Sequence, residues 1–307
     1  MIEFNGVGYT YRSLIKQRRV RAVDDFTLSI GAGEVLGLAG PNGAGKTTLI
    51  ALMLGFLRPT DGDVRVDGQS PRRFVERNGV GYLSELVNIP PRWSVEQALT
   101  RFALLAGVAD RDLRQSVDAV IDRLGIGEHR KKAIRQLSKG NLQRLGLAQA
   151  LLRDERVLIL DEPTHGLDPV WTQRFRDIAA ELRRPDRILF IASHNLDELQ
   201  RLADRVAIID RGRLQRVVAT RAGASAVGET TPTPYLLTVA AGAEIVAAVF
   251  PDARATGRGE FELPALELTA LNRGIAELVA RGVLVTMLTP VHTALEQQFR
   301  EAVGEQA

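Results

Sequence analysis

The sequence predicts an α/β fold built on a mostly parallel sheet, followed by a small α+β module. Short apolar runs alternate with helical patterns over residues 1 to about 220. Two of these runs, Val157–Leu160 and Ile188–Ile191, are apolar without alternation, which is typical of strands covered on both faces of a parallel sheet. The composition then shifts at residues 221–233 to small residues, threonine and proline, and we expect a linker there.

The N-terminal elements follow from the positions of the apolar residues. Three strands are expected, at Ile2–Asn5, Phe26–Ile30 and Val35–Ala39. A helix should follow the third strand, because apolar residues recur with the spacing of one helical face at Leu49, Leu52, Met53 and Phe56. The segment of about 93–152 should also be helical, with apolar faces formed by Val95, Leu99 and Phe102 and by Leu113, Val117 and Val120.

A second pattern follows the expected linker. It predicts a small α+β domain over residues 234–307, a size within the usual range for a domain. The expected strands are Tyr235–Val239, Glu260–Leu263 and Val283–Leu288, and the expected helices are Ala243–Phe250, Leu268–Ala280 and Val291–Ala302.

Composition excludes several classes of protein. The 307 residues hold 40 Lys and Arg against 37 Asp and Glu, a formal net charge of only +3, so we expect no nucleic acid as a partner. The absence of cysteine excludes disulfides, thiolate metal sites and cysteine nucleophiles. No apolar run approaches the ~20 residues of a membrane span, and the first residues lack the apolar core of a signal peptide. We expect no covalent membrane anchor, so a membrane role would act through a partner.

A glycine-rich loop follows the expected strand Val35–Ala39. Residues 40–47 match the phosphate-binding pattern G-x-x-x-x-G-K-[ST]. Glycines let the backbone wrap closely around a triphosphate, and N–H groups at the start of the next helix favour anions. Lys46 can reach the β- and γ-phosphates, and the Thr47 hydroxyl can bind Mg²⁺. The residues expected to bind nucleotide here are Gly40, Pro41, Asn42, Gly43, Ala44, Gly45, Lys46, Thr47 and Thr48.

Polar side chains follow two of the buried strands. Asp161 comes directly after Val157–Leu160, at an edge of a parallel sheet where it can hold Mg²⁺ directly or through water. Glu162 follows it and can polarise an attacking water. His194 comes shortly after Ile188–Ile191, so its imidazole could contact the γ-phosphate and orient that water.

These motifs, in this order, resemble those of the nucleotide-binding subunit of ATP-binding cassette (ABC) transporters. The deciding segment is Leu137–Arg144, which resembles the family's signature motif. Gly166–Pro169 resembles the family's dimer-contacting loop, and Gly79–Glu85 resembles the segment that joins the core to the helical subdomain. Tyr11 stands where the family places an adenine-stacking aromatic, although Tyr9 is an alternative.

The resemblance covers residues 1–220 and implies a P-loop NTPase with a RecA-like core, an antiparallel β subdomain and a helical subdomain at about 86–152. It implies a homodimeric ATPase that uses ATP and Mg²⁺, in which each signature closes on the γ-phosphate held by the other subunit. The implied catalytic residues are Glu162, His194 and Lys46, and the implied metal ligands are Thr47, Asp161 and Glu85. The other implied nucleotide-binding residues are Tyr11, Glu85, Ser138, Gly140 and Asp168.

Two departures from the family pattern point to a smaller group within the family. Glu85 stands where the family usually has glutamine, and the signature holds Lys139 and Asn141 instead of glycine and glutamine. Similar variants occur in ATPases of ABC-2-type exporters, whose chains often end in a helix like the one expected around Leu295–Phe299. The resemblance therefore implies integral membrane permease subunits as partners and a location at the cytoplasmic face of the cell membrane.

Alternatives stay open at this stage. A soluble ABC ATPase that acts on ribosomes or DNA would share the motifs, whereas an unrelated P-loop kinase or GTPase would leave Ser138–Arg144 and His194 unexplained. A basic cluster also allows two interpretations, contact with anionic lipid headgroups or, more simply, a solvated loop. Its members are Arg12, Lys16, Arg18, Arg19 and Arg21.

Overall fold

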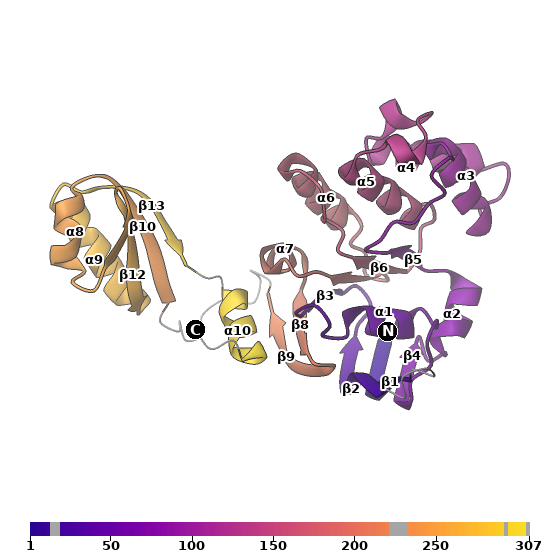
Figure 1. Cartoon of the computed structure of the whole chain (residues 1–307), viewed down its shortest axis with the longest axis horizontal. Coiled ribbons are helices and arrows are strands. Elements are labelled where there is room, and N and C mark those ends of the chain that lie inside the picture. The colour runs from indigo at the N-terminus through magenta and orange to yellow at the C-terminus, as the bar shows by residue number, and fades with distance from the viewer. Residues whose placement is uncertain (13–18, 221–232, 292–293, 305–307) are drawn as a thin grey trace. The chain divides into compact units, whose positions relative to one another are not determined.

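The computed structural model describes residues 1–12, 19–220, 233–291 and 294–304 (Figure 1). The chain divides into two compact units, one formed by Met1–Arg221 with Ala302–Ala307 and the other by Ala222–Glu301. Almost all of the expected linker, 221–233, lies outside the described residues, and Thr233 already belongs to a strand. Among the described residues, no helix has the length and apolar character needed to cross a membrane.

A six-stranded sheet forms the centre of the first unit, in the order β5-β6-β7-β3-β8-β9. Its first five strands are parallel and β9 is antiparallel to β8. All residues of β3, β6 and β7 are buried, which explains why these strands are apolar without alternation. The strands are β3 (Val35–Ala39), β5 (Gly81–Leu83), β6 (Val157–Asp161), β7 (Ile188–Ala192), β8 (Arg205–Asp210) and β9 (Arg213–Ala219).

A three-stranded antiparallel sheet lies in the same unit, in the order β2-β1-β4. It consists of β1 (Ile2–Arg12), β2 (Arg19–Ile30) and β4 (Asp61–Val66), so the first two strands are longer than expected. Arg12 pairs with Arg19 across this hairpin, while Lys16 and Arg18 lie outside the described residues. Arg21 forms an ion pair of 2.6 Å with Asp24 and is therefore part of the sheet's own charge pattern.

Helices flank the central sheet. The helix after the glycine-rich loop, α1 (Lys46–Met53), is shorter than expected, because Gly55 adopts a left-handed φ of 71° and turns the chain. The expectation that Phe56 belongs to the buried face was wrong, since Phe56 is 71% exposed. The other helices here are α2 (Pro71–Asn78), α6 (Pro169–Glu181) and α7 (Leu196–Leu202).

The segment expected to be helical holds α3 (Val95–Leu105), α4 (Leu113–Arg123) and α5 (Lys139–Ala150), with two short 3₁₀ helices, Gly127–His129 and Ile134–Gln136. Ser94 caps α3 through a reciprocal pair of hydrogen bonds with Gln97. On the expected apolar faces, Val95, Leu99, Val117 and Val120 are buried. Through these faces α3, α4 and α5 pack on one another.

The second unit contains a four-stranded antiparallel sheet in the order β11-β12-β10-β13. Its core includes Leu237 and Leu263 from the strands and Val246 and Leu278 from α8 and α9. The β-α-β-β-α-β element order confirms the expected α+β class. β11 was not expected, because all four of its residues are exposed. The elements are β10 (Thr233–Ala241), α8 (Ala243–Val249), β11 (Arg254–Gly257), β12 (Glu260–Leu266), α9 (Leu268–Ala280) and β13 (Leu284–Pro290), and α10 (Ala294–Val303) follows.

Candidate functional site

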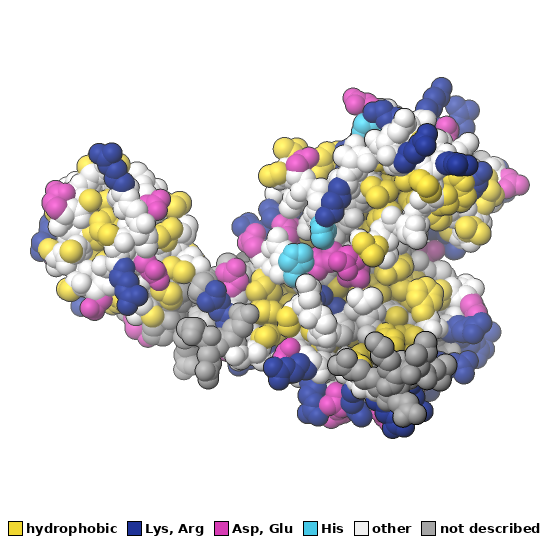
Figure 2. All heavy atoms as spheres, viewed as in Figure 1, with side chains coloured by type: hydrophobic (Ala, Val, Ile, Leu, Met, Phe, Trp, Pro, Cys, Tyr) yellow, Lys and Arg dark blue, Asp and Glu magenta, His cyan; other side chains and the backbone are white. Residues whose placement is uncertain are grey.

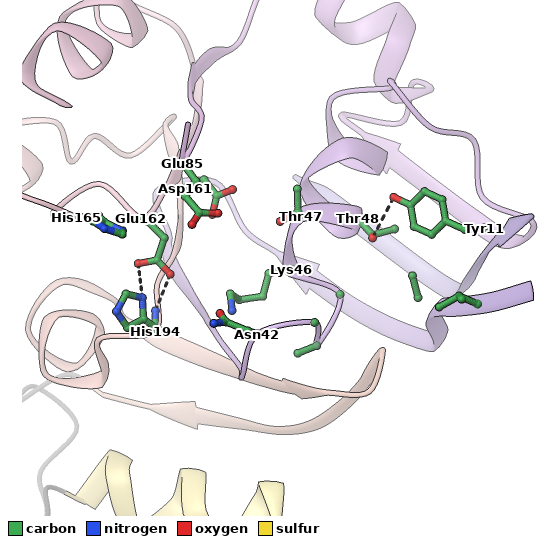
Figure 3. Close-up of a pocket in the computed structure, with 15 residues that line it drawn as sticks. Tyr11, Asn42, Lys46, Thr47, Thr48, Glu85, Asp161, Glu162, His165 and His194 are labelled. Carbon is green, nitrogen blue, oxygen red and sulfur yellow. Dashed lines mark hydrogen bonds and ion pairs between the residues drawn. The ribbon is translucent and has the colours of Figure 1, made fainter. Parts of the chain in front are cut away.

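A cavity of about 810 Å³ lies beside the carboxyl ends of β3, β6 and β7 (Figure 3). It brings together the glycine-rich loop, the acidic end of β6, His194 after β7, Glu85 after β5 and Tyr11 from β1. These segments are far apart in the sequence, and the fold brings them to one cavity. The lining residues are Tyr11, Val20, Ala22, Asn42, Gly43, Ala44, Gly45, Lys46, Thr47, Thr48, Glu85, Asp161, Glu162, His165 and His194.

The glycine-rich loop ends at Gly45, the residue before α1, which has a φ of 109°. A Cβ at this position would lie 2.5 Å from the Ala22 carbonyl oxygen, so only glycine fits. The Lys46 ammonium donates to the carbonyl oxygens of Gly40 at 2.7 Å and Pro41 at 3.3 Å. Gly40 and Pro41 are not among the lining residues, and their contact with the site runs through Lys46.

Asp161 lies at the centre of the negative charge in this cavity. It is 3% exposed, and burial raises the pKa of its carboxyl to about 7, with further increases from Glu85 and Glu162 and a smaller opposing effect of Lys46. Three carboxyl groups with one ammonium among them make a site that favours an added cation.

The donor set of this cavity fits Mg²⁺. Among the described residues, no group of three or more histidine, cysteine and acidic side chains is arranged to hold a metal ion by itself. Mg²⁺ is usually bound through one or two carboxylates, with substrate phosphates and water completing its shell. Asp161, Glu85 and the Thr47 hydroxyl line the same cavity as the phosphate-binding loop, so they could take that part together with a nucleotide.

Glu162 is buried, and its carboxylate is held from two sides. It accepts hydrogen bonds from the Ser193 hydroxyl at 3.1 Å and from the His194 backbone N–H at 2.9 Å. The His194 Nδ1 lies 2.8 Å from the same carboxylate, as the dashed lines in Figure 3 show. The His194 side chain is 64% exposed, so it reaches from this contact into the open cavity.

The apolar wall of the cavity lies on the antiparallel sheet. Tyr11 lines it together with Val20, its partner across the β1–β2 pairing, and Ala22. The Tyr11 hydroxyl is 3.4 Å from the Thr48 hydroxyl. Tyr9 packs against the hydrophobic core instead, so Tyr11 is the residue positioned to meet a planar ring.

Ser138, Gly140 and Asp168 do not line this cavity. They line a separate cavity of about 340 Å³, together with Lys139 and Asn141. The Ser138 hydroxyl caps α5 by accepting from the Asn141 N–H at 3.2 Å. The Asp168 carboxylate caps α6 in the same way, through the N–H of Trp171 at 2.9 Å.

The sequence did not indicate His165 as a site residue. Its imidazole lines the larger cavity, and its Nε2 lies 2.5 Å from the Lys139 ammonium beside the smaller one. Its position three residues after Glu162, in the turn that begins there, was the available signal. Val20 and Ala22 were also missed, because their place opposite Tyr11 depends on the strand register.

Comparisons with known proteins indicate the family of the chain. A family model described as ABC transporter matches residues 23–165. The ABC transporter ATP-binding protein NatA of Bacillus subtilis is 32% identical over 203 residues, covering 65% of this chain and 82% of that protein. This chain belongs to the ABC transporter ATP-binding proteins. An uncharacterised ABC transporter ATP-binding protein of Nostoc is 40% identical over 205 residues, and the match spans 64% of this chain and 59% of that protein.

Another relative and two solved structures extend the comparison. The bacitracin transport ATP-binding protein BcrA of Bacillus licheniformis is 34% identical over 199 residues and covers 63% of each chain. The ATP-binding cassette MJ0796, solved as a dimer bound to ADP and phosphate, superposes with a TM-score of 0.66 at 19% identity over 72% of this chain and 99% of that one. CbiO1 of Clostridium perfringens, part of an ABC transporter complex, gives a TM-score of 0.58 at 26% identity over 71% and 88% of the two chains. The similarity to the MJ0796 structure supports the fold of the ATP-binding unit.

Proposed function

We propose that this chain is the ATP-hydrolysing subunit of an ABC-2-type exporter and that it works as a pair of identical chains. The observation that carries the proposal is the separation of two half-sites within one chain. The phosphate loop and the Glu162–His194 pair share one cavity, while the signature residues Ser138 and Gly140 line another. A second chain, related by a two-fold axis, would bring its signature to the nucleotide in the first cavity and complete two equivalent sites.

In this proposal, different residues of the cavity bind the adenine, the phosphates and the metal ion and direct the attacking water. Tyr11 would stack on the adenine, the loop amides and Lys46 would bind the phosphates, and Thr47, Asp161 and Glu85 would hold Mg²⁺. When bound, Mg²⁺ neutralises charge on the β- and γ-phosphates. Glu162 accepts a hydrogen bond from the attacking water and directs it, while His194 links that carboxylate to the γ-phosphate. Catalysis is then positioning and charge stabilisation without a covalent intermediate.

Several features support the exporter assignment. Three sequence features resemble those of ABC-2-type exporter ATPases. They are Lys139 in the signature, Glu85 after β5 and the Leu295–Phe299 segment within α10. BcrA, one of the relatives, carries bacitracin transport in its name. The chain would then bind integral membrane permease subunits at the cytoplasmic face of the membrane, and closing and opening of the ATP-bound pair would switch them between two arrangements.

The pair can be tested with purified protein. Sedimentation velocity of Glu162→Gln with Mg²⁺ and ATP should show a dimer that separates on removal of nucleotide, because binding would persist without hydrolysis. Lys46→Ala should lose both the dimer and the turnover. A Glu162→Gln protein that binds ATP but stays monomeric at all concentrations would refute the proposal. Co-purification with an integral membrane protein tests the exporter assignment separately.

A further inference from the structure

The turn after β6 holds Glu162 in an unfavourable backbone conformation. Its φ is 50°, in the left-handed region that a residue with a side chain rarely adopts, and the residue is 6% exposed. The N–H of Glu162 donates to the Ala192 carbonyl at 2.8 Å, and its carbonyl accepts from the His165 N–H at 3.1 Å. Strained residues persist where their surroundings hold them, and here the held residue lines the cavity proposed to bind the nucleotide.

Gln143 supplies a further restraint that the proposed mechanism does not use. Its side-chain amide nitrogen donates to the Glu162 carbonyl at 2.9 Å and to the Pro163 carbonyl at 3.2 Å. Because carbonyl oxygens only accept, this contact fixes which end of the amide faces the turn. Gln143 is 5% exposed, so the two carbonyls would have no water to replace it.

Gln143 also sits on the helix that begins with the signature. α5 starts after Ser138, which caps it, and Gln143 follows five residues after Ser138, about 7.5 Å along the helix axis. One helix therefore carries the residues proposed to meet the partner's nucleotide and the side chain that holds the turn of this chain's own Glu162. A displacement of α5 would reach Glu162 through two hydrogen bonds.

We infer that Gln143 is a positioning residue, which fixes the Glu162 turn and couples the signature helix to the carboxylate that directs the attacking water. The inference rests on the proposed function, since it assigns Gln143 a part in the same hydrolysis. Gln143 touches neither nucleotide nor water, and acts on the rate through the placement of Glu162. A misplacement of a catalytic group by about 1 Å can cost on the order of a hundredfold in rate.

The test compares Gln143→Met with wild type and with Gln149→Met. Methionine has the length of glutamine but donates no hydrogen bond, and Gln149 lies on the same helix but lines a different cavity, with Val80 and Phe102. We expect kcat for Mg–ATP to fall at least about tenfold in Gln143→Met, while KM and the dissociation constant of ATP change less than about threefold. Gln149→Met should keep the wild-type kcat. In a Glu162→Ala background, single-turnover rates should show no further loss from Gln143→Met, because the group it positions is already gone.

Each outcome decides the inference. A wild-type protein without ATPase activity refutes the proposed function itself. An active wild type with an equally active Gln143→Met refutes only the inference. Equal losses in kcat and ATP binding, or an additive loss in the Glu162→Ala background, show a purely structural role and also refute it. If circular dichroism shows that Gln143→Met does not fold, Gln143→Asn replaces it in the test, because the shorter amide cannot reach both carbonyls. A wild-type kcat in Gln143→Asn refutes the inference.

Discussion

The buried carboxyl of Asp161 should destabilise the nucleotide-free protein at neutral pH, and Asp161→Asn should remove that effect. Burial and the neighbouring Glu85 and Glu162 raise the pKa of Asp161 to about 7 in the folded state. In the unfolded chain, where the carboxyl is solvated, the pKa has its ordinary value of 3.8. The folded protein thus binds this proton more tightly than the unfolded protein. Its free energy of unfolding is highest below pH 4, falls between about pH 4 and pH 7, and is level above pH 7 as far as this group is concerned.

The magnitude follows from the difference between the two pKa values. At about 1.4 kcal/mol per pKa unit, ionised Asp161 lowers the free energy of unfolding by on the order of 4 kcal/mol at pH 8. At pH 5 the group is largely protonated in the folded state, and the effect shrinks to about 2 kcal/mol. Asp161→Asn, which cannot ionise, should therefore gain roughly these amounts over wild type at the two pH values.

Urea denaturation of both proteins, without nucleotide and followed by circular dichroism at pH 5 and pH 8, measures the gain. Asp110→Asn, at an exposed position, serves as a control and should shift the transition little. Mg–ATP should reverse the order, because Asp161→Asn would lose a proposed metal ligand and with it part of the stabilisation by bound nucleotide. The reasoning is refuted if Asp161→Asn is no more stable than wild type at pH 8, or if its gain does not decrease towards pH 5.

Three further changes test the remaining parts of the site. Tyr11→Ala should raise the dissociation constant of ATP about tenfold, measured by calorimetry, since base stacking on an aromatic ring contributes about 1–3 kcal/mol; unchanged affinity would exclude stacking. Glu85→Gln should move the acid limb of the ATPase pH profile to lower pH, because Glu85 raises the pKa of Asp161, and it should change the Mg²⁺ concentration for half-maximal rate. If neither moves, Glu85 is only structural. A mixture of Lys46→Ala and Ser138→Arg chains, each inactive alone, should regain up to about a quarter of the wild-type ATPase rate. About half of the pairs then contain one chain of each kind, and each such pair has one of its two sites built from an intact phosphate loop and an intact signature. No recovery would contradict sites shared between chains.

The central strands and the phosphate loop could be predicted from the sequence because their signals are local. β3, β6 and β7 are buried along their whole length, so their apolar runs mark their positions within a residue. The helix α9 matches its expected range, since a single apolar face sets its period. The end of α1 was misjudged at Phe56, because helical spacing of apolar residues does not reveal that Gly55 turns the chain.

What the sequence could not indicate are contacts that depend on register or on distant elements. Val20 reaches the nucleotide cavity only through its pairing with Tyr11 across the hairpin. Ser193 and Gln143 carry no motif that marks them as partners of Glu162, and their roles come from the side-by-side placement of β6, β7 and α5. The strand β11 lacks buried residues and so lacks the alternation by which strands are recognised.

The short segment from Asp161 to Asp168 connects the two half-sites within one chain. It begins with the buried carboxyl of Asp161, passes through Glu162 and His165, and ends at Asp168, which caps α6 and lines the smaller cavity. Within this segment His165 contacts Lys139, so a partner's nucleotide that displaces Lys139 would act on the same turn that Gln143 restrains through its hydrogen bonds. Two contacts from the signature region therefore converge on the turn that carries the Glu162 carboxylate. If the proposed pair forms, we expect this site to reach its hydrolytic geometry only when the signature is engaged, so that hydrolysis stays low in the unpaired chain and closure of the pair permits it.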